Sequence, residues 1–355
     1  MKAFILLTFF SATVVRSATM YSVVDLGSFG GGSSVAYRIN NAGVAVGWSA
    51  TPLADNHAFS TSLGSLQDLN QASASNSLAY DSNGSGQIAG TSYVDGQNHG
   101  SVWSGSGFTD LGAGTFAMSI NSSGQVAGTN GHAFVYDNGK FTDLGTISGG
   151  NWTAAYGIND GGMVAGYGDI GNGIFRAFTW TAATGLKTLG TLGGGNSYAM
   201  AINNRGQVAG HSTVASGYEH AFVDNNGILT DLGTLGGGNS YAYDINDGGA
   251  VVGYSGADAF LYRGGNLSDL NSLIGSTSGW QLQQAYGINN AGQIVGSGRY
   301  QGQSHAFVLD PVQTLNANQI RGSSTAVPEP GSAMLFAAGL ALLAIAPIRR
   351  AMRNL

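Results

Sequence analysis

The sequence predicts an all-β fold, a seven-bladed β-propeller of four-stranded blades, and three observations support this prediction. A phrase of the form Gly-x-Val-x-Gly recurs through the body of the chain, as in Gly206–Gly210 and Gly292–Gly296. The 355 residues include 59 glycines without a three-residue period, together with many Val, Ile, Tyr and Phe residues. Asn-Gly and Asp-Gly signals separate the apolar runs, which is typical of short strands joined by tight turns.

Seven copies of a repeat can be aligned on this phrase. Its last glycine falls, at intervals of 38 to 44 residues, at Gly47, Gly90, Gly128, Gly166, Gly210, Gly253 and Gly296. Before the phrase comes an Ala- and Tyr-rich segment that ends in Ile-Asn, with Tyr80-Asp81 as the departure in copy two. After it comes His-Ala-Phe or a variant, at His57, His99, His132, Arg176, His220, Asp258 and His305. Asp-Leu-Gly or a variant follows, as in Asp143–Gly145.

Each repeat contains the signals for two hairpins. Asn159-Asp160-Gly161-Gly162 places residues that tolerate positive φ between the Ile-Asn segment and the glycine phrase. Asn138-Gly139 separates the next two segments and would place Phe134 opposite Asp143. Four strands in about 43 residues suit one propeller blade, and we expect the propeller over residues 20–311.

The composition of the strands predicts their order within a blade. The Ile-Asn strand is rich in small residues, which suit the crowded position nearest the axis. The first Asp-Leu-Gly strand, Tyr21–Gly27, then belongs to no blade of its own and would complete the seventh blade beside His305–Phe307, which closes the ring. Residues Val312–Asn316 compete for the same position. An open β-repeat solenoid is the alternative architecture.

Nearly the whole body, Tyr21–Asp310, resembles the HAF family of extracellular repeats, named for His-Ala-Phe. The resemblance implies a repeat architecture outside the cell. It implies no particular chemistry, because no activity is established for the family.

The N-terminal residues 1–19 have the layout of a secretory signal peptide. Lys2 precedes an apolar run, Ala3–Val15, and small residues follow at Ser17–Thr19. Arg16 departs from the pattern expected near a cleavage site. We therefore expect the chain to pass through the export machinery.

The C-terminal region predicts a membrane anchor. After a linker, residues 312–326, an uncharged apolar stretch predicts a transmembrane helix over about residues 331–348. Arg349, Arg350 and Arg353 follow it, so the positive-inside rule places the C-terminus in the cytoplasm and the body outside.

A short motif stands directly before this helix, at Val327-Pro328-Glu329-Pro330. With the apolar helix and the Arg cluster, residues 327–355 resemble the PEP-CTERM sorting signal of Gram-negative bacteria. The resemblance implies processing by an exosortase-type membrane protease, transient anchoring in the inner membrane, and a final place on the cell surface, on the outer membrane or outside the cell. A permanent single-pass anchor is the alternative.

Charge and the positions of the histidines exclude several classes of site. Residues 20–326 contain 18 acidic and eight basic side chains, so nucleic acid is excluded as a partner. Five of the six histidines hold the same repeat position and are spread over five blades, so they would not converge on one metal or catalytic centre. We expect them to bond a neighbouring Asp or the backbone. His211 is the exception.

The remaining motifs nominate no catalytic residue, metal ligand or cofactor site. The Asp-Leu-Gly aspartates occur one per blade, and Glu219 is the sole glutamate of the body, which excludes a Glu pair for glycoside hydrolysis but not an Asp pair at the axis. The Gly-rich loops at Gly193 and Gly236 lack the lysine of a phosphate-binding loop. The Asn-Asp-Gly turns lack the ligand spacing of a calcium loop.

The loops between the second and third strands vary most from copy to copy. Variable loops on one face of a rigid scaffold are where binding specificity usually lies. Four aromatic residues in or beside them are candidates to stack on sugar rings: Trp48, Tyr93, Tyr218 and Tyr300. Ordinary packing of strand-end aromatics is the other interpretation.

The sequence therefore predicts an exported cell-surface or extracellular-matrix repeat protein. We expect a non-catalytic binding or structural module, with polysaccharide or matrix proteins as partners; the association with exopolysaccharide is what the PEP-CTERM resemblance implies. The alternative functions are a propeller glycoside hydrolase or lyase with Asp residues near the central channel, and a structural spacer. Three or more Asp or His side chains meeting at the axis would favour an enzyme, whereas a channel lined by Ala, Asn and backbone would favour binding.

Overall fold

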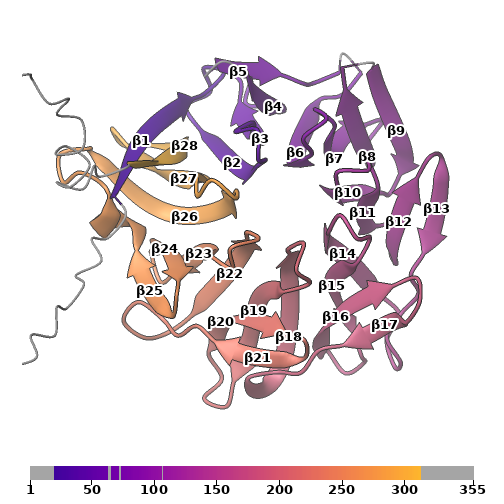
Figure 1. The fold of residues 1–355 in the computed structure, drawn as a ribbon. Coiled ribbons are helices and arrows are strands. Elements are labelled where there is room, and N and C mark those ends of the chain that lie inside the picture. The colour runs from indigo at the N-terminus through magenta and orange to yellow at the C-terminus, as the bar shows by residue number, and fades with distance from the viewer. Residues whose placement is uncertain (1–19, 63–64, 72, 106, 313–355) are drawn as a thin grey trace, which may run out of the picture. The chain divides into compact units, whose positions relative to one another are not determined.

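Seven four-stranded antiparallel sheets stand around a central opening in the computed structural model (Figure 1). The structure describes residues 20–62, 65–71, 73–105 and 107–312. The predicted signal peptide, the predicted transmembrane helix and the sorting motif lie outside these residues. Within them, no helix is long and apolar enough to span a membrane.

Each sheet is one blade, with its strands in chain order from the axis outward. Blades one to three are β2 (Ser34–Ile39), β3 (Ala45–Ala50), β4 (Asn56–Ser62) and β5 (Ser65–Asp68); β6 (Asn76–Ser82), β7 (Ile88–Val94), β8 (Gln97–Ser104) and β9 (Gly107–Ala113); β10 (Phe116–Ile120), β11 (Val126–Thr129), β12 (Ala133–Asp137) and β13 (Lys140–Asp143). Blades four to six are β14 (Thr153–Ile158), β15 (Val164–Asp169), β16 (Phe175–Thr181) and β17 (Gly185–Thr188); β18 (Gly193–Ile202), β19 (Val208–Val214), β20 (Glu219–Asn225) and β21 (Ile228–Asp231); β22 (Ser240–Ile245), β23 (Val251–Ser255), β24 (Asp258–Arg263) and β25 (Asn266–Asp269).

The seventh blade joins the two ends of the propeller. It contains β26 (Trp280–Ile288), β27 (Ile294–Tyr300), β28 (Gln303–Val312) and, as its outer strand, β1 (Met20–Gly27). Met20 pairs with Val312 and Asp25 with Phe307. The ring is therefore closed by the first strand, as the strand order predicts, and the open solenoid is excluded. Val312 belongs to β28, and the rest of the competing segment lies outside the described residues.

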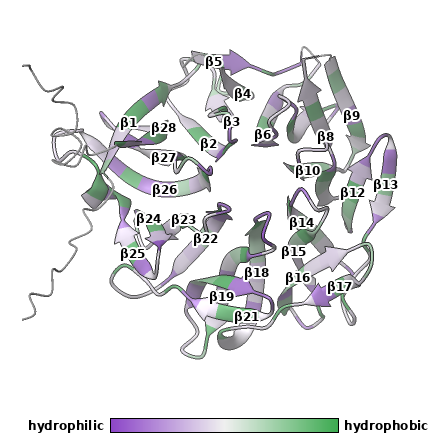
Figure 2. Ribbon diagram, in the orientation of Figure 1, coloured by the Kyte–Doolittle hydropathy of each residue, from purple (hydrophilic) through white to green (hydrophobic). Residues whose placement is uncertain are grey.

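The hairpins define two faces of the propeller. The inner strands all end at the Ile-Asn turns, and we call that end the ring face. The turns between second and third strands and the connections between blades lie at the opposite end, the loop face. The register of the third and fourth strands is as predicted, since Phe134 pairs with Asp143. Figure 2 shows hydrophilic residues where inner strands end around the opening.

The core is divided into seven clusters, one between each pair of neighbouring blades. The phenylalanines of the His-Ala-Phe strands are fully buried in six of the blades. Blade two has Ser101 at this position, and Trp103 on the same strand fills the space against Gly90. Each blade thus packs on the next through one large ring, which explains why the repeat requires an aromatic residue here.

The inner strands differ from the prediction in one respect. Their alanines are fully buried between the blades and do not line the channel: Ala36, Ala79, Ala117, Ala155, Ala199, Ala242 and Ala285. Directly after each of them a β-bulge places one extra residue on the inner strand. A bulge redirects a side chain, and these extra residues are large: Tyr37, Tyr80, Met118, Tyr156, Met200, Tyr243 and Tyr286. The small residues therefore suit the crowded inner strand, as expected, but they pack between blades while large residues line the channel.

Candidate functional site: the central channel

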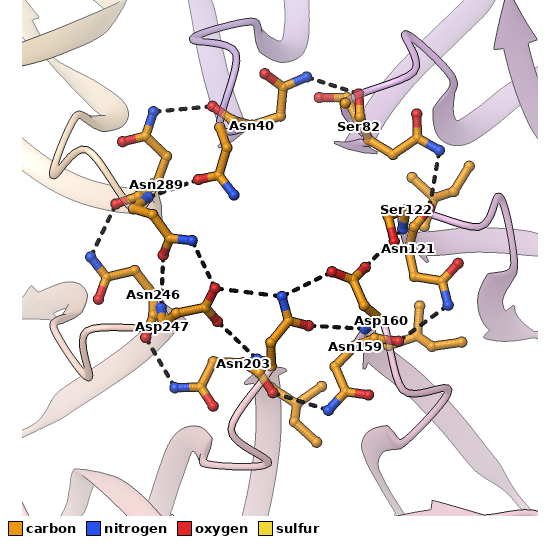
Figure 3. A pocket seen from close by; sticks show the side chains of 18 of the residues that line it. Asn40, Ser82, Asn121, Ser122, Asn159, Asp160, Asn203, Asn246, Asp247 and Asn289 are labelled. Carbon is orange, nitrogen blue, oxygen red and sulfur yellow. Dashed lines mark hydrogen bonds between the residues drawn. The ribbon is translucent and has the colours of Figure 1, made fainter.

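A closed ring of seven asparagines surrounds the channel at the ring face (Figure 3). The side-chain amide of each donates to the backbone carbonyl of the next, at 3.0 to 3.1 Å. The members of this asparagine ring are Asn40, Asn83, Asn121, Asn159, Asn203, Asn246 and Asn289. Asn83 is the member from blade two, so the alignment of Tyr80-Asp81 with the Ile-Asn landmark is wrong by two residues. The landmark is explained by ring closure.

Each ring asparagine also organises its own turn. The Oδ1 atom of Asn203 accepts the backbone N–H groups of Arg205 and Gln207, at 3.0 and 2.9 Å. Its Nδ2 atom donates to Gln207 Oε1 as well as to the next blade. These bonds engage both ends of the carboxamide, so the ring is a structural element and leaves these side chains little capacity for a ligand.

A second circle of polar residues lies at the mouth of the channel, around a cavity of 320 Å³. Asn204 Nδ2 donates to Asp160 Oδ2 at 2.9 Å, and Asn290 Nδ2 donates to Asp247 Oδ2 at 2.7 Å. Although burial opposes it, hydrogen bonds from Ser122 and Asn204 hold the pKa of Asp160 below its ordinary value. The mouth at the ring face is therefore polar and negatively charged.

The bulge residues line the channel between this ring and the loop face. Five tyrosines and two methionines, with Arg38, surround a cavity of 210 Å³. Each blade contributes one bulge residue, so the lining repeats the symmetry of the fold. Large, weakly polar side chains that converge on a cavity are typical of ligand pockets.

The channel tyrosines continue into a longer series of aromatic contacts. Ring centroids 4.7 to 5.8 Å apart connect ten rings from blades two, one, seven, six, five and four. In order of contact, this aromatic band consists of Tyr80, Tyr37, Tyr286, Tyr243, Tyr254, Tyr241, His211, Tyr198, Tyr167 and Tyr156. The members on second strands follow the glycine phrase and so extend the band toward the loop face.

The aromatic band is uncharged at neutral pH. Burial raises the pKa of Tyr286 to about 12 and raises those of Tyr156 and Tyr243 further. Burial also lowers the pKa of His211 to about 4, so its imidazole is neutral. His211 stacks on Tyr198 with 4.7 Å between centroids. The band therefore consists of tyrosine rings with their hydroxyl groups and a neutral, buried imidazole.

One cation lies in the channel lining and reaches across the ring. Arg38 of blade one donates through Nη1 to the carbonyls of Tyr286 and Tyr243, at 2.6 and 3.2 Å. The same nitrogen lies 3.8 Å from Asp244 Oδ2. Arg38 thus connects blade one with blades seven and six.

Two buried carboxylates of the inner strands bridge neighbouring blades. Asp81 accepts hydrogen bonds from the Ser119 hydroxyl, at 2.7 Å, and from the Ile120 N–H, at 3.0 Å. Asp244 accepts the N–H of Ile288 in the same way, at 2.9 Å. Burial raises the pKa of both carboxyl groups, and the charge of Arg38 opposes this rise. Both carboxylates are already engaged with backbone groups, so the geometry favours a structural role over acid–base chemistry.

The acidic residues at the axis fall short of the pattern expected for an enzyme. Asp81 and Asp244 come from different blades, and the residues that line this cavity include no Asp or His. Among the described residues, no group of three or more His, Cys, Asp or Glu side chains comes together as a metal site.

The five repeated histidines lie on the third strands or, for His132, directly before one, and pair with the Asp-Leu-Gly aspartates of the fourth strands. Their Nδ1 atoms lie 2.8 to 3.0 Å from the carboxylates, in the pairs His57–Asp68, His99–Asp110, His132–Asp143, His220–Asp231 and His305–Asp25. The expected bond to a neighbouring Asp is confirmed. Because the pairs sit on five different blades, they form no common centre.

The four aromatic candidates from the sequence lie on four blades. Trp48 Nε1 donates to the Tyr37 hydroxyl at 3.1 Å, so it supports the channel lining. Tyr300 stacks on Trp280, with 4.9 Å between centroids. Tyr93 and Tyr218 are 40% and 53% exposed. The structure thus separates two packed aromatics from two that a ligand can reach.

The aromatic band itself was missed in the sequence. Its signal was present, because a Tyr or Met stands two positions before the Ile of the Ile-Asn landmark in the aligned copies, as Tyr156 and Met200 show. Strict alternation would place that residue on the same face as Ile. The bulge is what turns it into the channel.

Comparison with known proteins is informative about the fold alone. The sequence matches no protein-family model and no curated protein. A puromycin-hydrolysing peptidase from Mycobacterium tuberculosis is similar over 82% of this chain and 56% of that one, with a TM-score of 0.52 and 12% identity. YCF48 bound to D1 peptide is similar over 86% of this chain and all of that one, with a TM-score of 0.50 and 11% identity.

A gluconolactonase from Xanthomonas campestris is similar over 64% of this chain and 82% of that one, with a TM-score of 0.40 and 12% identity. These solved proteins differ in what their names say they do. At such identities, structural likeness carries no chemistry from one protein to another. The chain is thus an all-β, seven-bladed propeller whose site must be interpreted from its own residues.

Proposed function

We propose that this chain is an exported, non-catalytic binding module, and that its ligand is a neutral polysaccharide held at the loop face over the channel. The aromatic band is the observation that carries the proposal. The C–H faces of sugar rings pack on aromatic faces, while tyrosine hydroxyls bond sugar hydroxyls. Five tyrosines of the band line the channel cavity and offer such contacts to one sugar unit, and the other rings continue the band toward the loop face.

The charge of the site supports a neutral ligand. The tyrosines and His211 are uncharged at neutral pH, and the acidic balance of residues 20–326 repels polyanions. Arg38 offers no free positive charge, because two carboxylates and two carbonyls surround it. A cavity of 210 Å³ is small, so a polymer would insert one unit and extend over the loops.

Export and surface sorting belong to the same proposal. They rest on residues 1–19 and on the sequence Val327–Pro330 with Arg349 and Arg350. Fractionation of cells and the mass of the mature chain test this part. We expect the chain in the surface or medium fraction to lack both terminal segments. A full-length chain in the cytoplasm would contradict this part of the proposal.

Ligand binding is tested by a glycan-array and soluble-polysaccharide screen on the purified protein. In Met118→Trp, a larger side chain fills part of the channel, and we expect affinity for the polymer to fall by about tenfold or more. Ile228→Ser is the control, because Ile228 is 71% exposed at an outer hairpin. Equal melting temperatures establish that both variants fold.

Two results would contradict the proposal. Either the wild-type protein binds no polysaccharide, or Met118→Trp and Met200→Trp both bind as the wild type does. The second result would leave the polymer bound elsewhere.

A further inference from the structure

We infer that two crevices between blades on the loop face are additional sites for neutral sugars, so that the protein holds a polymer at several points. This inference rests on the proposed polysaccharide function and extends it to named sites outside the channel. One crevice lies between blades one and two, and the other between blades three and four. Neither is lined by a member of the aromatic band, although Trp152 of the second crevice contacts Tyr167 of the band, with 5.5 Å between ring centroids.

The first crevice is built on a row of cross-strand partners in blade two. Tyr93 of β7 pairs with Asn76 of β6 on one side and with Asn98 of β8 on the other. Directly paired residues present their side chains on the same face of a sheet. An aromatic ring therefore stands between two carboxamides, at the edge of a cavity of 280 Å³.

One carboxamide of this crevice is oriented by a hydrogen bond, and another is available to a ligand. The N–H of Asn56 in blade one donates to Asn76 Oδ1 at 2.8 Å, which orients that carboxamide. Within the described residues, no hydrogen bond engages the side chain of Asn98, and Tyr93 is 40% exposed. No charged side chain lines the cavity.

The second crevice occupies the equivalent place in the repeat. Ala133 N–H donates to Thr153 Oγ1 at 2.9 Å, as Ala58 N–H donates to Ser77 Oγ at 2.9 Å between blades one and two. Trp152 precedes Thr153 and thus corresponds to Asn76. With Asn130, His132 and Asn151 it lines a cavity of 450 Å³.

A contrasting crevice shows what a filled position looks like. Between blades four and five, Arg176 replaces the repeated histidine and donates to the Gly195 carbonyl. There Phe175 N–H donates to the Asn196 carboxamide, and an arginine covers the space beside it. In the first open crevice Tyr93 and asparagines line the cavity, and in the second the repeated histidine, His132, lines it beside Trp152 and two asparagines.

The lining determines the class of ligand. An exposed ring face takes the apolar face of a sugar, and carboxamides donate to and accept from its hydroxyl groups. The acidic balance of the chain opposes phosphate or sulfate. Two sites on the same face of one propeller would bind a repeating polymer with avidity that exceeds the affinity of either site.

The test compares Tyr93→Ala, Trp152→Ala and the double variant with the wild-type protein, using soluble α-glucan, β-glucan and galactomannan polymers and their short oligosaccharides. We expect each single change to weaken polymer binding by about tenfold and the double change by about a hundredfold. Oligosaccharide binding should lose one site in each single variant. Ile228→Ser is again the control, since Ile228 is 71% exposed and lies outside both crevices. Asn98→Ala is a second probe that breaks no internal hydrogen bond.

The outcomes distinguish the crevice sites from the channel site. If the double variant and Asn98→Ala bind the polymer as the wild type does while Met118→Trp does not, the crevice sites are wrong and the channel proposal stands. If the crevice variants lose binding and the channel variants do not, the crevices are the site and the channel proposal is wrong. A wild-type protein that binds none of the polymers or oligosaccharides overturns both.

Discussion

At Gly210 the strand β19 passes so close to β18 that a Cβ atom would lie 1.9 Å from the carbonyl oxygen of Tyr198. The equivalent distance is 1.9 to 2.0 Å at the other glycines that end the repeated phrase. The repeated phrase therefore ends in glycine because the bulge of the inner strand places a carbonyl close to the second strand. Glycine is required there by contact.

Gly210→Ala should lower the free energy of unfolding by about 3 kcal/mol, because the backbone cannot move without disturbing the bulge. Urea denaturation measures this. Gly190→Ala is the control, since a Cβ at Gly190 meets nothing within 4 Å, and we expect a change within about 1 kcal/mol. Equal effects of the two changes would disprove the contact argument.

His211 makes stability depend on pH in a predictable direction. Burial lowers its pKa from 6.5 to about 4 in the folded protein. Between these values the unfolded chain binds more protons than the folded one, so the fold loses stability as pH falls. Unfolding in urea at pH 7 and pH 5 should show a loss of about 2 kcal/mol from this residue.

The control for this prediction is His211→Phe, which keeps a ring between Tyr198 and Tyr241. Burial raises the pKa of Glu219, so that residue acts with the opposite sign in both proteins and cancels in the comparison. The variant should lose less stability than the wild type on acidification. Parallel pH profiles would mean that His211 is protonated in the folded state.

Among the elements of the fold, the Ile-Asn turn holds each blade to the next. Asn203→Ala would leave the N–H groups of Arg205 and Gln207 without their partner and would remove the bond to the next blade at the carbonyl of Asn246. We expect a loss of about 3 kcal/mol in the free energy of unfolding, because part of this network is buried.

Asn204→Ala in the same turn is the matched control. Asn204 is exposed and its partners Asp160 and Asp247 can bond water instead, so we expect a loss below about 1 kcal/mol. Thermal or urea unfolding separates the two variants. A larger loss in Asn204→Ala would show that the mouth of the channel, and not the asparagine ring, carries the closure.

The elements that recur as short sequence phrases could be predicted, because each phrase reports a local requirement. The Asn138-Gly139 turn fixed the pairing of Phe134 with Asp143, and the structure has that register. The channel lining could not be predicted from alternation, since a bulge shifts the face on which Tyr156 and its equivalents lie. The crevices could not be predicted from the sequence, because they depend on contacts between different blades.

At the scale of the whole molecule, the propeller is cut where another blade has a hairpin. In blade five Asn225 pairs with Ile228 across Asn226 and Gly227, both at positive φ. In blade seven the corresponding pair is Asp310 with Ser22, and the pairing continues two residues further to Val312 and Met20. The two ends of the propeller thus lie where another blade has a tight turn. Ring closure depends on the pairing of strands and not on which strands are covalently connected.

A circular permutant tests this directly. Joining Val312 to Met20 through Asn-Gly and opening the chain between Asn226 and Gly227 moves the composite blade from position seven to position five. Because every strand keeps its partners, the permutant should unfold in urea with a free energy within about 1 kcal/mol of residues 20–312 in native order. Residues 28–312, which lack β1, leave β28 with an unpaired edge and should aggregate or lose cooperative unfolding. If the permutant fails to fold while the native order folds, closure depends on the identity of the β1–β28 blade and not on the ring of pairings.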